Sequence, residues 1–270
     1  MNDPQECRWE LVGDLMQAAV VTLGPGQGCV GEAGAMLYVS DAIELETGLT
    51  TKPEGRSVAG AVLEAVKRKV AGDSFLVTRF RNAGSDRAEV AFSAPFPGKI
   101  LRVELDRHPD GIVLQKDAFL CGSQGIEIVP TLQRSILAGL FGGEGFILQK
   151  VTSSAPGATV LAHACGSLIE RTLTAGESLR IDAGCVVAYE PSVTFDVKVI
   201  GNLPTMMFAG HGAFFATLRG PGRVWVQTMP FARLAARVWD AAPQRKALPQ
   251  EQERVAREAA EDAVKDVRKA

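Results

Sequence analysis

Two side chains on one predicted strand, followed by an acid, form the pattern with the clearest chemistry in this sequence. His163 and Cys165 are two residues apart, so on a strand they share a face. Glu170 follows past a turn, and its carboxylate can converge on that face. An imidazole, a thiolate and a carboxylate are ligands that zinc accepts. The spacing therefore makes His163, Cys165 and Glu170 a candidate metal site.

The residues around this site also allow a second interpretation. Their spacing resembles the first metal-binding motif of the cupins, in which two histidines and a glutamate bind a metal ion. Here Cys165 stands at the second histidine, and Val187 matches the position of the last one. Gly157 and Gly176 fit the motif, but glycines at such a spacing also serve the turns of a β-rich fold. A degenerate cupin-like metalloprotein or enzyme and a fold whose glycines only shape turns both remain open.

Few residues in the sequence could form another kind of catalytic site. The chain has three histidines, His108, His163 and His211, and they show no spacing that singles out a nucleophile with its base. Five cysteines without a C-x-x-C pair favour buried free thiols. The segment Gly24 to Gly28 lacks the Gly-Lys-Ser/Thr ending of a phosphate-binding loop and predicts a β-turn. We expect no enzymatic activity and no cofactor.

Length and charge exclude several classes of protein. The 270 residues are 46% hydrophobic, which suffices for a large core, and 29 basic against 31 acidic residues leave a net charge of −2. That balance provides no positive field for nucleic acid. The best apolar run, 136–148, is too short for a spanning helix and contains Glu144. Residues 1–6 carry acids where a leader needs basic residues, so a cytoplasmic location is expected.

Strand-like patterns recur three times along the chain. An apolar run, a polar turn and an apolar strand align without gaps at 34–44, 117–127 and 184–194. A glycine turn entering a strand follows each copy, at 72–76, 143–147 and 210–214. A third marker, a glycine turn before alternating residues, begins at Pro97, Gly166 and Gly220. The markers predict three units of antiparallel strands near residues 20–105, 106–173 and 174–230.

Three polar residues occupy the same place in the second marker. Asp73, Glu144 and His211 would lie around one axis if the three units are related by pseudo-threefold symmetry. Such a cluster would form a polar mouth or bind a cation. The alternative is that each side chain accepts hydrogen bonds from the backbone of its own turn.

Helices and contact surfaces complete the predictions. Helical spacing of apolar residues predicts helices at 58–70 and 231–239, and Pro249 can begin a helix in a charged tail. The glycine-rich apolar stretch 136–146 is a candidate subunit interface or, as an alternative, a peripheral membrane contact. The candidate interface residues are Leu137, Leu140, Phe141 and Trp225.

Taken together, these motifs resemble the family of Altered Inheritance of Mitochondria protein 24 over roughly residues 20–231. The residues that carry the resemblance are Gly34-Ala35-Met36, Gly72 to Phe75, Pro97-Gly98, Ala118 to Leu120, Gly143 to Phe146, Leu173 with Gly176-Glu177, and Gly220 to Trp225. The resemblance implies stacked β-sheets of the double-stranded β-helix kind, similar in fold alone to the tryptophan RNA-binding attenuator protein. It also implies scaffolding more than chemistry. His211 departs from the family, which usually has glutamate there.

These observations predict an all-β protein. Residues 1–230 would form three pseudo-repeats of antiparallel strands in a double-stranded β-helix-like body, and residues 231–270 a helical cap and a charged tail. The expected function is that of a non-catalytic scaffold or binding protein that self-associates, with a trimer favoured and no nucleic acid bound. A second protein is the alternative partner.

Overall fold

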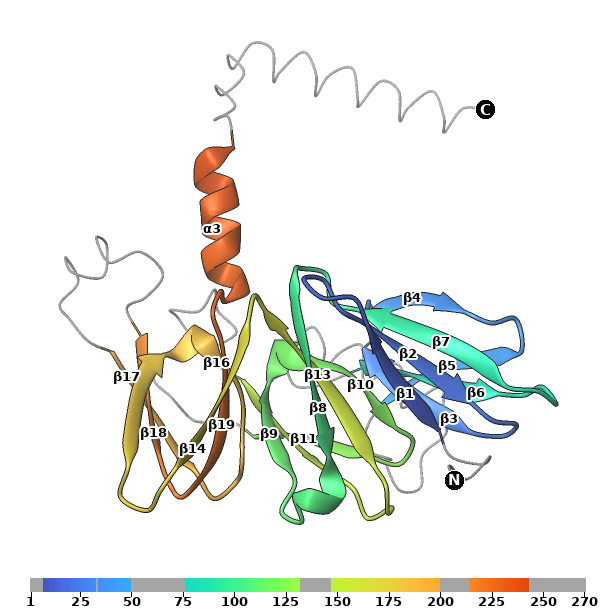
Figure 1. The fold of residues 1–270 in the computed structure, drawn as a ribbon, viewed down its shortest axis with the longest axis horizontal. Coiled ribbons are helices and arrows are strands. Elements are labelled where there is room, and N and C mark those ends of the chain that lie inside the picture. The colour runs from blue at the N-terminus through green and yellow to red at the C-terminus, as the bar shows by residue number, and fades with distance from the viewer. Residues whose placement is uncertain (1–6, 33, 50–75, 132–146, 200–213, 243–270) are drawn as a thin grey trace, which may run out of the picture. The chain divides into compact units, whose positions relative to one another are not determined.

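The structure, a computed structural model, describes residues 7–32, 34–49, 76–131, 147–199 and 214–242 (Figure 1). The chain divides into two compact units, Met1–Arg233 and Leu234–Ala270. In the described part of the first unit, four antiparallel sheets contain nineteen strands. The predicted all-β class is confirmed.

Two of the sheets consist mainly of strands from the first half of the chain. Sheet A has the order β1 (Arg8–Val12), β2 (Ala18–Leu23), β7 (Ala88–Ser93) and β4 (Met36–Val39). Sheet B has the order β5 (Ile43–Leu49), β6 (Leu76–Asn82), β3 (Gly28–Glu32), β10 (Phe119–Ser123), β13 (Thr159–Cys165) and β8 (Gly98–Glu104).

The other two sheets consist mainly of strands from the second half of the chain. Sheet C has the order β11 (Glu127–Thr131), β12 (Leu148–Thr152), β9 (Ile112–Gln115), β16 (Val186–Tyr189), β19 (Gly222–Gln227) and β14 (Leu168–Leu173). Sheet D has the order β15 (Ser178–Asp182), β18 (Phe214–Arg219) and β17 (Thr194–Val199). The short 3-10 helices are η1 (Leu105–Arg107), η2 (Lys116–Ala118) and η3 (Ala183–Cys185).

The same pairing pattern occurs in three consecutive sets of six strands, β2–β7, β8–β13 and β14–β19. In each set the sixth strand pairs with the first and third, and the fifth pairs with the second and fourth. The third strand has a register irregularity at the same place in each set, after Met36, Phe119 and Val186. Residues of different sets that occupy the same place in this pattern are therefore structurally equivalent.

The six-strand sets begin and end earlier than the three predicted units. They cover residues 18–93, 98–165 and 168–227. The third sequence marker explains part of the difference, because β8 and β14 begin their sets whereas β19, which follows Gly220, is the last strand of its set. A glycine turn followed by alternating apolar and polar residues is typical of any strand in a hairpin. This marker therefore does not specify the place of a strand within its set.

Sheets B and C are buried on both faces. Leu120 packs in the core between sheets A and B, whereas its neighbour Phe119 packs in the core between sheets B and C. A third core lies between sheets C and D and includes Val186 and Leu218. Each set contributes strands to two sheets, so the three cores join the sets to one another. Burial of each such side chain stabilises the fold by about 1.5–3 kcal/mol.

Two predictions concern helices. The helix predicted at 231–239 is confirmed as α3 (Phe231–Ala241), whereas the helices predicted at 58–70 and after Pro249 lie outside the described residues. None of the helices within the described ranges is long and apolar enough to span a bilayer.

Candidate functional site

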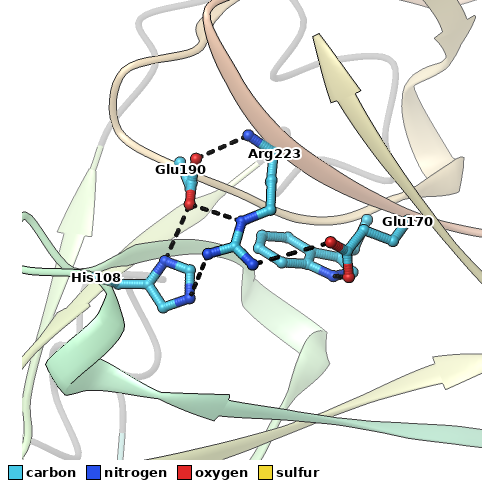
Figure 2. Close-up of polar contacts among 5 residues, drawn as sticks. His108, Glu170, Glu190 and Arg223 are labelled. Atoms are coloured by element: carbon cyan, nitrogen blue, oxygen red, sulfur yellow. Dashed lines mark hydrogen bonds and ion pairs between the residues drawn. The ribbon is translucent and has the colours of Figure 1, made fainter.

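A polar network joins the second and third six-strand sets (Figure 2). His108 follows η1, in the connection between β8 and β9. Glu190 directly follows β16, and Arg223 lies on the neighbouring strand β19. Trp225 lies two residues further along β19 and therefore on the same face, opposite Glu170 of β14. Strands that are distant in sequence thus place five polar or aromatic side chains together.

Glu190 holds both the backbone and the side chain of Arg223. The Arg223 backbone N–H donates to Glu190 Oε2 at 2.8 Å, and Arg223 Nε donates to Oε1 at 3.0 Å. The Glu190 backbone N–H donates in return to the Arg223 carbonyl at 2.9 Å. Burial raises the pKa of Glu190, but the hydrogen bonds from Arg223 outweigh it, so this pKa lies below its usual range. Glu190 is therefore a charged structural partner at neutral pH.

His108 is held as the neutral imidazole. Its Nδ1 lies 3.1 Å from Glu190 Oε1, and its Nε2 lies 3.3 Å from Arg223 Nη2. Because a guanidinium only donates, Nε2 must accept and Nδ1 must carry the proton. Burial, and then the charge of Arg223, lower the pKa of His108 despite the opposing effect of Glu190. Both ring nitrogens are thus occupied by partners.

Arg223 also contacts a second carboxylate and an aromatic ring. Figure 2 shows its guanidinium beside Glu170, whose Oε1 lies 3.9 Å from Nη1. The indole N–H of Trp225 donates to Glu170 Oε2 at 2.9 Å, and the guanidinium carbon lies 5.6 Å from the Trp225 ring centroid, within cation–π range. Since Trp225 is part of the core between sheets B and C, the network anchors partly exposed charges on that core.

Replacing Arg223 with alanine should lower the free energy of unfolding by about 2 kcal/mol, because it leaves the mostly buried Glu190 carboxylate without its cation. Arg81→Ala is the matched control, since Arg81 is also a strand arginine but pairs with Glu44 in the solvent. The control should change stability by less than about 0.5 kcal/mol. Urea unfolding at pH 7 measures both, and equal losses would show that the network contributes no more than a surface ion pair.

The predicted metal ligands do not form a cluster in the structure. His163 and Cys165 lie on β13, both buried and on one face as expected. Glu170 lies on β14 of sheet C, where Trp225 Nε1 holds its carboxylate. Across the described ranges, no three His, Cys, Asp or Glu side chains are close enough to share a metal ion. The structure therefore places Glu170 in the polar network rather than with His163 and Cys165.

His163 has an apolar environment. Its ring lies edge-on to Phe96, at 4.8 Å between ring centroids, and Phe96 stacks on Phe231 at 5.4 Å. Its Nδ1 is buried and has no hydrogen-bond partner among the described residues. Burial lowers the pKa of His163 to about 4. The ring is therefore neutral at physiological pH.

The other predicted site residues divide into two groups. Asp73, Glu144, His211, Leu137, Leu140 and Phe141 lie outside the described residues. Trp225, predicted as an interface residue, is only 2% exposed. This prediction needs correction, because the indole packs inside the chain against the core between sheets B and C. An apolar strand residue in the sequence does not reveal whether its face is covered by another sheet.

Sequence reasoning missed His108, Glu190 and Arg223, although one signal pointed to Glu190. The aligned segments 34–44, 117–127 and 184–194 place Ser40, Ser123 and Glu190 at the same position. In the structure each of these side chains accepts a hydrogen bond from a backbone N–H at the start of the sixth strand of its set. The distances are 3.0, 2.9 and 2.8 Å respectively. Glu190 is longer than serine, so it also reaches the Arg223 side chain and His108.

A pocket of about 440 Å³ lies beside β5 and β6. Its lining combines acids, bases and apolar groups, among them Glu44, Glu46, Arg79, Arg81 and Leu45. Glu44 and Arg81 already pair with each other at 3.3 Å. The mixed lining favours no single class of ligand.

A second candidate site is the surface of sheet A. Exposed large apolar side chains occur on its two edge strands and in the turn after β1, and they are Leu11, Val12, Leu15, Met16, Met36, Leu37 and Tyr38. The last sheet differs, because the face of sheet D turned away from its core is mainly polar: it carries Ser178, Arg180, Thr217, Arg219 and Asp196 beside the large apolar side chain Phe215. The two terminal sheets therefore present surfaces of different chemistry.

Comparison with known proteins assigns the chain to a family. The family model described as mitochondrial biogenesis AIM24 matches residues 9–229. The chain belongs to the AIM24 family. The resemblance predicted from the sequence motifs is thus confirmed, and the match covers all three six-strand sets of this AIM24 protein.

A solved structure shares the fold of this AIM24 protein. The crystal structure of protein SPYM3_0169 from Streptococcus pyogenes is similar, with a TM-score of 0.68 over 87% of this chain and 99% of that chain. The sequences are 21% identical, so this likeness concerns the fold alone. Comparison with curated proteins gives no match.

Proposed function

We propose that this AIM24 protein is a non-catalytic scaffold that self-associates, with a homotrimer as the favoured state. The observation that carries the proposal is the set of exposed apolar side chains at the edges of sheet A, where Leu37 on β4 and Leu15 and Met16 in the turn after β1 are more than half exposed. Exposed apolar side chains gathered on one sheet are typical of protein contact surfaces. Burying them against another copy of the chain would remove this area from water.

The state of the reactive side chains supports a role without catalysis. Burial raises the pKa of Cys29, Cys121 and Cys165, so these thiols stay protonated and are poor nucleophiles. His108 has a partner at each ring nitrogen, and His163 is buried against Phe96. General acid–base catalysis needs a group that reaches a substrate and titrates near the working pH, and neither histidine meets both conditions.

Size-exclusion chromatography with light scattering tests the proposal. At micromolar concentrations we expect a mass that is a multiple of the 28.7 kDa chain, with three chains as the favoured number. Dilution should lower the mass, because a contact between exposed surfaces is a reversible equilibrium. A single-chain mass at every concentration up to about 50 µM would exclude self-association with micromolar affinity.

A further inference from the structure

Three aromatic rings connect the start of α3 to a buried histidine. Phe231, the first residue of α3, stacks on Phe96 at 5.4 Å between ring centroids, and Phe96 lies edge-on to His163 of β13 at 4.8 Å. Phe96 belongs to residues 94–97, the connection between β7 and β8. His163 is 8% exposed, whereas Phe231 is 54% exposed. The outer ring of this aromatic contact is therefore accessible to water, and the inner ring is not.

The third set shows how a polar side chain at the place of His163 can be satisfied. Gln227 of β19 is equivalent to His163, because each lies opposite the same place in the first strand of its set. Gln227 Oε1 accepts a hydrogen bond from the Cys165 N–H at 2.8 Å. Its Nε2 donates to the Gly184 carbonyl, also at 2.8 Å. Both polar atoms of this side chain thus have partners.

His163 lacks such a partner at Nδ1. Residues 94–97, which the ring contacts through Phe96, include Pro95 and Pro97, and proline has no N–H. Nδ1 is buried, and no hydrogen-bond partner for it occurs in the part of the chain that the structure describes. A protonated imidazole carries an N–H at both nitrogens, so Nδ1–H would be buried without an acceptor. Protonation therefore favours movement of the ring out of the aromatic contact.

Charged groups around the ring do not offset its burial. Those on the adjoining segments are Lys116 and Asp117 of η2, Lys99 of β8 and Arg233 of α3. Asp117 favours the protonated imidazole, but burial outweighs it and lowers the pKa of this histidine to about 4. Arg233 pairs with Asp182, and Lys99 pairs with Asp14. The neutral ring is thus maintained by the apolar cover.

The first turn of α3 depends on this cover. Within the described ranges, its side chains contact the strands through the stack of Phe231 on Phe96 and through Arg233, whose Nη2 donates to Asp182 Oδ2 at 2.7 Å. Arg233 is half exposed, and ion pairs of such groups contribute little on their own. A helix of 11 residues is only marginally stable in water without packing. Loss of the stack should therefore unwind α3.

We propose that His163, Phe96 and Phe231 act as an acid-sensitive latch, in which protonation of His163 releases the start of α3 from the strands. The coupling works in both directions, because two linked equilibria affect each other equally. Docking of Phe231 keeps the ring neutral, so removal of Phe231 must make protonation easier. The latch lies within one chain and does not rest on self-association.

Proton NMR titration of the full chain tests the coupling. The chain has three histidines, and loss of a signal in His163→Phe identifies the ring of His163. This ring should titrate near pH 4 in the unmodified chain. Phe231→Ala should raise the titration midpoint by at least about one pH unit, because it reduces the apolar cover. Trp239→Ala is the matched control, since Trp239 is an aromatic residue of the same helix but is 82% exposed. It should leave the midpoint unchanged.

Hydrogen exchange with mass spectrometry measures the release of α3 itself. After correction for the intrinsic pH dependence of exchange, the amides of residues 234–241 should exchange at least about tenfold faster at pH 4 than at pH 6. In His163→Phe the corrected rates should be equal at both pH values. The strand β19 is the internal reference, and its amides should stay protected at pH 4. Protection of β19 separates release of α3 from global unfolding.

The outcomes of the two experiments decide the proposal. A midpoint that rises in Phe231→Ala, together with acid-accelerated exchange in α3 that His163→Phe abolishes, supports the latch. A midpoint that is the same in Phe231→Ala and in the unmodified chain overturns it. Exchange in α3 that accelerates equally in His163→Phe shows that another group controls the release, which also overturns it.

Discussion

Replacing Gly98 with alanine is expected to destabilise the folded chain by at least about 3 kcal/mol, because the added methyl group has no space. Gly98 is buried at the start of β8. A Cβ there would overlap the carbonyl oxygen of Ala164 and lie 2.8 Å from its carbonyl carbon and 3.0 Å from Cys165 Cα. These are backbone atoms of the paired strand β13, so no side chain can rotate away.

The position of Gly98 increases the expected effect. Gly98 forms parallel bridges with Met16 and Gly166, each of which lies two residues before the first strand of its set, β2 or β14. The Gln17 N–H also donates to the Gly98 carbonyl at 3.2 Å. The starts of all three sets therefore meet at this residue, and displacing its backbone would disturb sheets A, B and C together.

Urea unfolding checks the effect against Gly34→Ala. An added Cβ at Gly34 would first meet the Glu32 carboxylate, with 3.3 Å to Oε2, and that side-chain end can move. We expect a change of less than about 1 kcal/mol for this control. If the two variants unfold at the same urea concentration, the close approach of β8 and β13 at Gly98 is absent in solution.

The stability of the protein should fall by about 2 kcal/mol between pH 7 and pH 5 through His163 alone. The unfolded chain has an ordinary histidine pKa of 6.5, whereas the folded chain holds the pKa of His163 at about 4. Because this pKa is lowered by folding, the unfolded state binds the proton first as the pH falls below 6.5. The contribution is therefore fully present above pH 6.5 and is lost progressively toward pH 4.

His163→Phe isolates this contribution. Phenylalanine is also aromatic, it can pack on Phe96, and it does not titrate. Between pH 7 and pH 5 the variant should lose about 2 kcal/mol less stability than the unmodified chain. Above pH 7.5 the two stability curves should run parallel, which is the internal control. Parallel curves between pH 5 and 7 as well would mean that His163 is not buried in the folded protein.

The candidate metal site shows which neighbours residue spacing can predict and which it cannot. Alternation along a strand predicts that His163 and Cys165 share a face, and both are indeed buried on β13. Glu170 is only five residues beyond Cys165, yet β14 belongs to sheet C and β13 to sheet B. Spacing along the chain does not show that the two strands separate into different sheets, because sheet membership depends on the partner strands.

The polar network had even less support in the sequence. Arg223 contacts His108 across 115 residues and Glu190 across 33. Glu190 and Arg223 lie within the recurring strand patterns at 184–194 and 220–225, but nothing in those patterns indicates that their side chains meet each other or His108. The only local sign of the network is that Ser40, Ser123 and Glu190 align in the sequence. Each side chain accepts a hydrogen bond from a backbone N–H at the start of the sixth strand of its set.

The sequence by itself determined the all-β class, the helix α3 and the family, because each depends on local periodicity or on short motifs of turns and strands. Only the tertiary structure decided which strands share a sheet, which apolar faces are covered, and that Trp225 is inside while Leu37 and Tyr38 are exposed. The physical reason is that side-chain alternation is a property of one strand. Burial is decided by the neighbouring sheet, whose strands come from distant parts of the chain.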